Sequence, residues 1–339
     1  RPLMVNQEND KASHIAKLKE DGSIDASFDV SNNIVGTVFH ILEVKDGLLV
    51  AGDFGLVKLN LNGSINESFQ INDFNGSVYD LTVSVEGKVV AVGAFTEVNG
   101  ENYVRVIRLR SNGEIDQSFN LGAGPNGDVF AVSRMNAGRI LIGGLFVTVD
   151  GLSVRRLALI KPDGTIDRSM DIGSGFNGPV RAIENRLDGN VLIGGAFTKY
   201  NYRDTKQLAM IGIDGSLKEY NFAELGLNET VYAISENPGG LVGVGGSFVK
   251  LDEKIGYNGF TLIEGSSSTQ PAKLAVGVVD GNLYMKVSGK PGLVYNIEIS
   301  ENMDSWSPFT EVTIPAEGAM TLELGETGGN RYYRAVYRE

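Results

Sequence analysis

Two polar side chains interrupt a position that is otherwise occupied by alanine in a recurring segment of the sequence. His40 and Asp80 stand where later copies of the segment carry Ala131, Ala182 and Ala233. A histidine beside a carboxylate can bind a polar ligand or take part in acid–base chemistry. The alternative is structural, because a short neighbouring segment leaves room that larger polar groups fill. His40 and Asp80 are therefore a candidate ligand site with a packing role as the competing interpretation.

Further carboxylates and tyrosines extend this candidate site. Glu43 and Glu184 lie three and two residues further along the same kind of segment. Because paired carboxylates hydrolyse glycosidic bonds, a carbohydrate-active enzyme is one hypothesis. Tyr200 and Tyr202 are the best candidates for stacking against a sugar ring. The spacing shows no evident carboxylate trio, so we assign no catalytic residue and favour a non-enzymatic role.

A second pattern places two oxygen-bearing side chains four residues apart around an Asp-Gly or Asn-Gly turn. The aspartate pairs of this kind are Asp21 with Asp25 and Asp163 with Asp167. Such side chains usually accept hydrogen bonds from the backbone of their own turn. Calcium is the alternative, but it requires about six to eight oxygen ligands. We therefore expect no cofactor and no metal, and Ca²⁺ remains the alternative at these turns.

Composition excludes several classes of function. The 339 residues include no cysteine, which excludes disulfides, thiolate catalysis and cysteine-ligated metals. The net charge of −12 disfavours phosphate backbones and anionic membrane surfaces, so we expect neither nucleic-acid binding nor membrane insertion. The sequence has no G-x-S-x-G, H-E-x-x-H or phosphate-loop motif. It begins at Arg1 without a signal peptide, so we expect a mature or excised part of a longer precursor.

The candidate residues lie within an internal repeat that covers most of the chain. A Gly-x-Phe marker recurs at intervals of 41 and then 51 residues, ending at Phe54, Phe95, Phe146, Phe197 and Phe248. An Asp/Asn-Gly turn followed by Ile or Leu recurs with nearly the same period, and many of the 44 glycines fall in these two markers. Each period contains four strand-like runs joined by tight turns, which is typical of one blade of a β-propeller.

The order of these runs predicts the architecture. Strands one and two of the blade occur five times, whereas the chain opens with strands three and four only. We predict an all-β fold with a five-bladed propeller over residues 1–264, in which N-terminal strands at 13–30 complete the last blade. Such closure removes exposed strand edges. A weak third strand near 259–263 is left over, so a ring of six or more blades is the alternative.

The repeat resembles a known family. Its consensus, LxxDGSIDxSF followed by VxAI and DGxxLIGGxF, is similar to the bacterial delta-60 type β-propeller repeat over about residues 13–250. The resemblance implies a secreted or surface bacterial protein and supplies no catalytic residues. The short first repeat and Lys218-Glu219 in the fifth turn depart from the pattern.

The last part of the chain has a different pattern. Residues 265–271 form a small polar linker, and residues 272–339 contain six alternating apolar runs that predict a small antiparallel β-sandwich. This part resembles modules that end large surface proteins of Verrucomicrobia-type bacteria. Trp306 is the only tryptophan, and we expect it in the sandwich core, with a sugar-stacking platform as the alternative.

Together these patterns favour a non-catalytic scaffold that acts in adhesion or binding outside a bacterial cell. The expected partner is a glycan or a surface protein, and the oligomeric state stays open. A carbohydrate-active enzyme or lectin that uses the mouth of the propeller channel is the second hypothesis. A structural spacer within a longer surface protein is the third.

Overall fold

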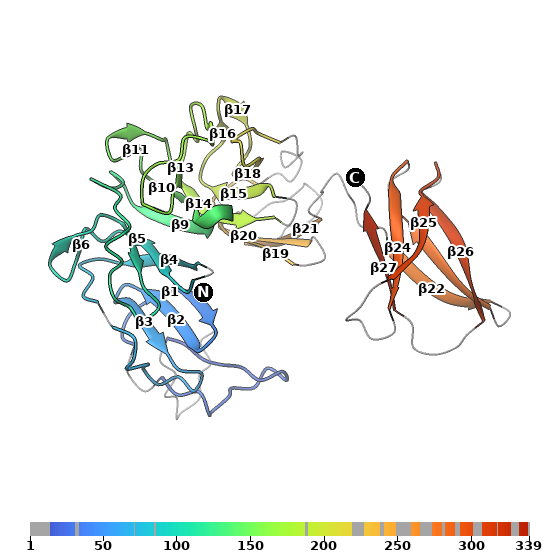
Figure 1. The fold of residues 1–339 in the computed structure, drawn as a ribbon, viewed down its shortest axis with the longest axis horizontal. Coiled ribbons are helices and arrows are strands. Elements are labelled where there is room, and N and C mark those ends of the chain that lie inside the picture. The colour runs from blue at the N-terminus through green and yellow to red at the C-terminus, as the bar shows by residue number, and fades with distance from the viewer. Residues whose placement is uncertain are drawn as a thin grey trace. The chain divides into compact units, whose positions relative to one another are not determined.

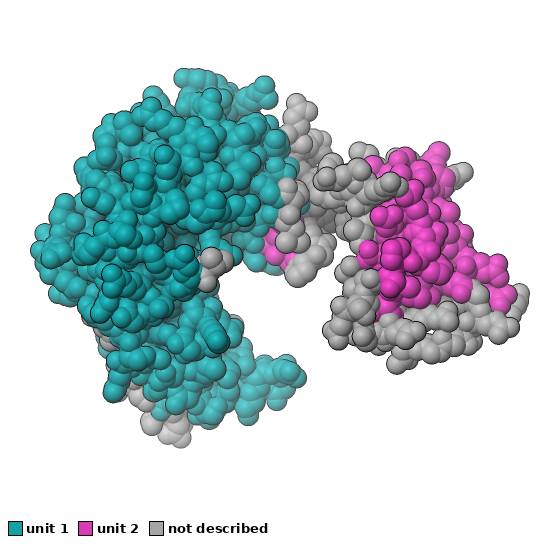
Figure 2. Space-filling model, in the orientation of Figure 1, with its two compact units in different colours: residues 1–235, 243–261 teal, residues 236–242, 262–339 magenta. Residues whose placement is uncertain are grey.

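The computed structural model describes residues 14–30, 34–70, 72–84, 86–186, 189–218, 227–237, 241–248, 259–264, 273–279, 282–288, 292–300, 307–316, 318–326 and 332–337. The predicted linker 265–271 and Trp306 lie outside these residues. The chain divides into two compact units, one of residues 1–235 and 243–261 and the other of 236–242 and 262–339 (Figure 2). Within the described residues, no helix is long and apolar enough to cross a membrane.

Five three-stranded antiparallel sheets follow one another along the repeats (Figure 1). The first three sheets are β1 (Val38–Val44), β2 (Gly47–Gly52) and β3 (Gly55–Leu59); β4 (Val78–Val83), β5 (Val89–Gly93) and β8 (Val106–Leu109); and β9 (Val129–Arg134), β10 (Ile140–Gly144) and β13 (Leu157–Ile160). The last two are β14 (Val180–Asn185), β15 (Val191–Gly195) and β18 (Leu208–Ile211); and β19 (Val231–Glu236), β20 (Leu241–Gly246) and β21 (Phe260–Glu264). In every sheet the strand with the Gly-x-Phe marker is central, as the repeat predicts.

Short additional elements decorate the middle repeats. Three two-stranded hairpins occupy the loop after the central strand, where the first repeat has a tight turn. They are β6 (Glu97–Val98) with β7 (Glu101–Asn102), β11 (Thr148–Val149) with β12 (Leu152–Ser153), and β16 (Lys199–Tyr200) with β17 (Arg203–Asp204). One 3₁₀ turn, η1 (Asn136–Gly138), joins β9 to β10. The ten-residue insertions seen in the sequence are therefore these hairpins.

The fourth strand of each repeat is reduced to a single bridge. The pairs are Leu59 with Ile65, Leu109 with Ile115, Ile160 with Ile166, and Ile211 with Leu217. The turn side chains explain the reduction: Asp163 accepts the backbone N–H of Thr165 and Asp167 that of Ser169, so these amides do not enter a ladder. The expected strand at residues 165–170 is thus mostly a series of capped turns.

The core lies between successive sheets. Three buried clusters each combine residues of neighbouring repeats, and the phenylalanines of the Gly-x-Phe markers in repeats two to four, Phe95, Phe146 and Phe197, are fully buried in them. Gly143 and Gly194 permit the close approach, because a Cβ atom there would overlap Val180 and Val231 of the following sheet. The repeat glycines thus set the spacing between sheets.

The N-terminal strand pair packs on the first sheet. Leu18 bridges Ile24, and Phe28, Val30 and Ile34 form a buried cluster with β2 and β3. The predicted closure of the last blade by this pair is not confirmed, because β21 holds the third place beside β20. The leftover run that made the blade number ambiguous is therefore a paired strand.

The C-terminal residues form two further three-stranded sheets. The first contains β22 (Lys273–Val279), β23 (Asn282–Ser288) and β26 (Ala319–Glu326), and the second contains β25 (Ser307–Thr313), β24 (Val294–Ser300) and β27 (Tyr332–Tyr337). Met285 of β23 and Tyr295 of β24 are fully buried in one shared cluster. All six predicted runs are strands, which agrees with the alternating pattern of the sequence.

Candidate functional site

The two residues that break the repeat pattern meet on neighbouring strands. Each lies on the first strand of its sheet, and these first strands, β1, β4, β9, β14 and β19, are the inner strands. Nδ1 of His40 on β1 lies 2.8 Å from Oδ1 of Asp80 on β4. The strand register explains the meeting, since both residues directly follow a bulge at the second position of their strand. The histidine side chain is 32% exposed and the carboxylate 18%. The structure thus brings together the pair singled out in the sequence, and its role as a ligand site stays a prediction.

The Asp80 carboxylate also accepts backbone hydrogen bonds from its own strand and from the next inner strand, β9. Its Oδ1 accepts the N–H of Leu81 at 2.9 Å, and its Oδ2 accepts the N–H of Val132 on β9 at 2.8 Å. One carboxylate therefore joins three consecutive inner strands. Both of its oxygens already have donors, which leaves little capacity for it to act as a general base on a bound substrate.

A row of stacked side chains runs beside this pair. Phe39, Tyr79, Phe130, Arg181 and Tyr232 occupy the same position in the five inner strands. The rings of Phe39 and Tyr79 are 5.3 Å apart, and those of Tyr79 and Phe130 are 5.5 Å apart. Cζ of Arg181 lies 3.7 Å from the centre of the Phe130 ring and 5.9 Å from that of Tyr232. This inner-strand row was not predicted, although its column of aromatic residues directly precedes His40 and Asp80 in the sequence.

The Arg181 guanidinium carries the one unpaired charge of this row. Its Nε atom is buried without a hydrogen-bond partner, and it forms no ion pair with another described residue. Guanidinium groups readily bind carboxylates with two parallel hydrogen bonds. Arg181 is therefore the residue of the inner-strand row best suited to an acidic group.

The other predicted site residues do not converge on the pair. Glu43 is exposed on β1 and Glu184 is half-buried on β14, and neither is among the partners of His40 or Asp80. Tyr202 is 82% exposed in the turn between β16 and β17. The predicted arrangement of a histidine and several carboxylates around one pocket is thus absent from the described residues.

Tyr200 is a core residue and is not available for stacking against a ligand. Its ring is fully buried 4.6 Å from that of Phe176, and its hydroxyl donates to the carbonyl of Gly215 at 2.6 Å. Burial, together with the charges of Asp171 and Asp214, raises the pKa of the Tyr200 hydroxyl far above its usual value. The expectation of a sugar-stacking role for Tyr200 was wrong. Val98 and Val149 stand at the same place in earlier hairpins, and both are buried.

The aspartates considered for calcium are hydrogen-bonded within their own turns. Asp21 accepts from the side chain and backbone of Ser23, and Asp163 accepts from the backbone and side chain of Thr165, which lowers the pKa of both carboxyls. Asp25 and Asp167 lie 3.4 Å from Lys17 and Arg139, respectively. No group of three or more metal-ligating side chains occurs among the described residues.

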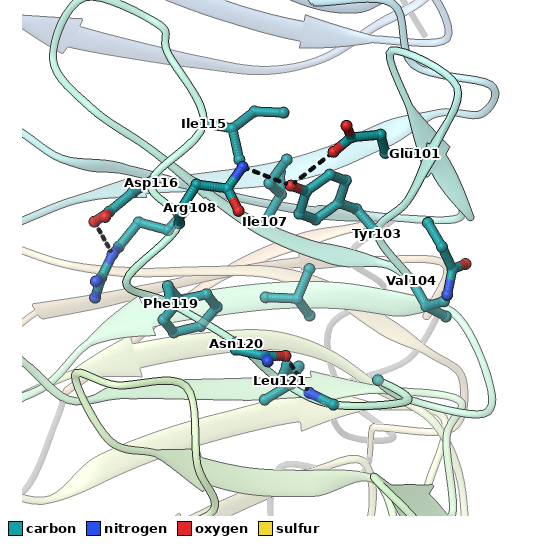
Figure 3. Close-up of a pocket in the computed structure, with 15 residues that line it drawn as sticks. Glu101, Tyr103, Val104, Ile107, Arg108, Ile115, Asp116, Phe119, Asn120 and Leu121 are labelled. Atoms are coloured by element: carbon teal, nitrogen blue, oxygen red, sulfur yellow. Dashed lines mark hydrogen bonds and ion pairs between the residues drawn. The ribbon is translucent and has the colours of Figure 1, made fainter.

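A polar cavity of about 280 Å³ lies in the second repeat and was not predicted (Figure 3). At one side Nε of buried Arg108 lies 2.8 Å from Oδ2 of Asp116, and at the other Tyr103 contacts Glu101. Burial alone would raise the pKa of Asp116, but hydrogen bonds from Ser118 and Lys88 and the Arg108 charge hold it well below its usual range. Arg108 and Asp116 have the same spacing in the sequence as Lys17 and Asp25, which also form an ion pair. This repeated spacing is the sequence signal that could have predicted the pair.

Part of the repeat matches a known family. Residues 45–69, 87–119 and 138–169 match the family described as "Domain of unknown function (DUF5122) beta-propeller". These segments make up less than half of the chain, and they coincide with the central, third and fourth strands of the first three repeats. No curated protein matches the chain.

Solved structures are similar at low identity. One is the extracellular domain of a protein described as a one component system of B. thetaiotaomicron, with 10% identity, coverage of 92% of this chain and 50% of that one, and a TM-score of 0.38. PorZ, a surface component of the type-IX secretion system of Porphyromonas gingivalis, has 12% identity and a TM-score of 0.36, and the match covers 88% of this chain and 51% of PorZ. A Bacteroides fragilis protein described as exported has 10% identity and a TM-score of 0.38, and the match covers 77% of this chain and 82% of that one. The chain spans about half the length of the first two structures. From the family match, the chain carries β-propeller repeats in an all-β fold.

Proposed function

We propose that this chain is a non-catalytic binding scaffold of a secreted or cell-surface bacterial protein. The observation that carries the proposal is the use of both Asp80 oxygens to join three inner strands. The residues that break the repeat pattern therefore support the framework, and no second carboxylate among the described residues is paired with them for acid–base work. The family match also assigns no activity to the repeats.

The location outside the cell is part of the same proposal. The structures named above include an extracellular domain, a surface component and an exported protein, each by its own description. The absence of cysteine is compatible with either side of a membrane. We propose adhesion or ligand presentation as the role and a glycan or a surface protein as the partner.

The architecture that we propose is a propeller of five blades, or a larger ring, followed by a small β-sandwich. The five sheets and the two C-terminal sheets with one shared core support it. In this arrangement the N-terminal strand pair supplies the outer half of a blade. The delta-60 type of repeat and the Verrucomicrobia-type C-terminal module belong to the same proposal.

A lectin that uses the inner-strand row is the second candidate. The partly exposed rings of Phe39 and Tyr232 and the unpaired Arg181 guanidinium favour it, since aromatic faces and a guanidinium suit an acidic sugar. Hydrolysis of such a sugar would require a carboxylate pair, which Glu43 and Glu184 do not form in the described residues.

One experiment separates these functions. The full chain is applied to an array of neutral and uronate-containing glycans, and release of reducing ends from the same glycans is measured in parallel. The scaffold proposal expects binding without hydrolysis, and the lectin proposal adds that Arg181→Ala abolishes binding to uronates only. Hydrolysis that Asp80→Asn abolishes while the fold is retained would contradict both. A chain that binds no glycan and no surface protein supports the spacer hypothesis instead.

A further inference from the structure

The residue before the Gly-x-Phe marker is a glycine in the central strands of the last three sheets, where it leaves a hole in the strand face, whereas Ala51 and Val92 stand there in the first two sheets. A Cβ atom on Gly143 of β10 would overlap Val180 and crowd Ile183 of the next inner strand. A Cβ atom on Gly194 of β15 would in the same way meet Val231 and Ile234. The hole is thus filled by a valine and an isoleucine of the following sheet. This contact is the repeated interface between blades.

Among the described residues, no side chain of another sheet fills the corresponding hole in the fifth sheet. A Cβ atom on Gly245 of β20 would have the Cβ of Ala233 at 3.7 Å and the carbonyl oxygen of Gly259 at 3.9 Å as its nearest neighbours, both from its own sheet. Phe260 on the adjacent β21 is 56% exposed, whereas Leu157 at the same position of β13 is fully buried. Within the part of the chain that the structure describes, no following sheet covers the face that carries Gly245.

The first sheet carries the matching valine, which is partly buried against the N-terminal cluster, and the matching isoleucine, which is exposed. Val38 and Ile41 of β1 stand at the positions of Val180 and Ile183. Ile41 is 45% exposed, whereas Leu81 and Val132, at the same position of β4 and β9, are 3% and 6% exposed. The exposure of Ile41 is larger because, among the described residues, no preceding sheet covers this part of β1.

The N-terminal strand pair already occupies the outer half of that preceding blade. The N–H of Asp29 donates to the carbonyl of Asn62 at 2.8 Å. The same bond recurs between later repeats, from Gln70 to Asn112, from Asn120 to Asp163 and from Asp171 to Asp214. Residues 14–30 thus dock on the first sheet as an outer blade half docks on its neighbour. Among the described residues, no inner half that would cover Ile41 lies beside them.

On the blade architecture proposed above, we propose that copies of this chain associate head to tail. Ile41 and Val38 of one copy insert at the empty Gly245 position of a second copy. The β19–β20 pair of the second copy then completes the half-blade that residues 14–30 begin. A second copy is the occupant because a single chain leaves both faces exposed, and the two faces reproduce an interface that the chain already forms between its own sheets. Such a heterologous contact produces rings or chains of copies.

This association has one structural consequence. Residues 14–18 of the first copy and β21 of the second copy compete for the edge of the same β20. Only residues 14–18 continue through an Asp-Gly turn into a fourth strand, so β21 gives up this edge in the assembly. Hydrogen exchange of the β21 amides therefore becomes faster as the copies associate, and that of residues 14–18 becomes slower.

The test uses sedimentation of the full chain with two variants that damage opposite faces. Gly245→Val is chosen to fill the hole, because no described atom lies within 3.4 Å of its Cβ position. Ile41→Lys charges the inserted residue. Leu152→Lys, at a residue that is similarly exposed but lies in the β11–β12 hairpin, is the matched control. Urea unfolding of each variant checks that the monomer keeps its stability.

The wild type and Leu152→Lys are expected to sediment above the monomer mass of 36.4 kDa, increasingly so with concentration. Gly245→Val and Ile41→Lys alone are expected to remain monomeric. An equimolar mixture of the two variants restores a dimer, because each supplies the face that the other has lost. A wild type that is monomeric at every concentration, including one that buries Ile41 by closing its own ring, overturns the proposal. Association of either variant with itself also overturns it, since this would mean that like faces pair.

Discussion

The carboxylate of Asp80 accepts the backbone N–H of Val132, which lies 52 residues further along the chain, at 2.8 Å. Its other oxygen lies 2.8 Å from His40 Nδ1, so the side chain connects inner strands of three successive repeats. Alanine stands at this position in the third, fourth and fifth repeats. The exceptional residues of this repeat therefore provide a specific link between strands.

Replacing Asp80 tests this link. Asp80→Asn should lower the free energy of unfolding by about 1–3 kcal/mol, because the amide nitrogen would face a donor and leave it unsatisfied. Urea denaturation measures the loss. Asp204→Asn, which breaks an ion pair between exposed side chains, should cost less than about 1 kcal/mol. Equal losses in the two variants would contradict a specific role for Asp80.

The buried ion pair of the second repeat makes a prediction about pH. The folded state holds the pKa of Asp116 well below its ordinary value of 3.8, so the ionised carboxylate stabilises the fold above that value. Asp116→Asn should therefore cost about 3–5 kcal/mol at pH 7, where it leaves buried Arg108 unpaired. The cost should shrink as the pH falls below about 4 and the wild type loses its own advantage. Urea unfolding at pH 7 and pH 3 measures it, and a cost independent of pH would be inconsistent with this assignment.

The glycine holes predict opposite effects of the same substitution. Gly194→Ala should destabilise the chain by about 1–3 kcal/mol, since its methyl group would collide with Val231 and Ile234. Gly245→Ala would make only ordinary van der Waals contacts with described residues at the same position of the repeat, and alanine restricts the unfolded chain, so its stability should be unchanged or slightly higher. Thermal unfolding of both variants at low protein concentration compares them. A comparable loss in both would mean that the Gly245 position is filled.

Calcium should leave the stability of this chain unchanged. The turn aspartates Asp21 and Asp163 accept hydrogen bonds from their own turns, and Lys17 and Arg139 lie beside Asp25 and Asp167. Thermal unfolding with millimolar Ca²⁺ and with a chelator should give the same midpoint. An increase with Ca²⁺ that Asp163→Asn removes would establish the calcium alternative, because ligands that bind the folded state raise its stability.

Much of the framework could be predicted because the repeat presents each signal several times. The Asp-Gly turns and the Gly-x-Phe markers located the strands, and the position shared by His40 and Asp80 indicated that these residues meet. Capping of the turn amides by aspartate and asparagine side chains is less visible in a sequence, which is why the fourth strands are shorter than predicted.

The errors at the site arose where one residue was considered apart from its repeat. Tyr200 suggested an exposed aromatic residue, yet Val98 and Val149 at the same position indicate a buried one. The inner-strand row escaped notice because Arg181 interrupts a column of aromatic residues, although a guanidinium stacks on an aromatic ring as another ring does. Closure of the last blade depends on contacts between distant ends of the chain, which local patterns do not determine.

The most direct test of the account is a double-mutant cycle between His40 and Asp80, measured as free energies of unfolding in urea. The variants are His40→Ala, Asp80→Ala and the double replacement. If the pair links the inner strands of a scaffold, the cycle should give a favourable coupling energy of about 0.5–3 kcal/mol. Losses that add within about 0.3 kcal/mol would show that the two residues do not support each other in the fold, and the account would then be wrong.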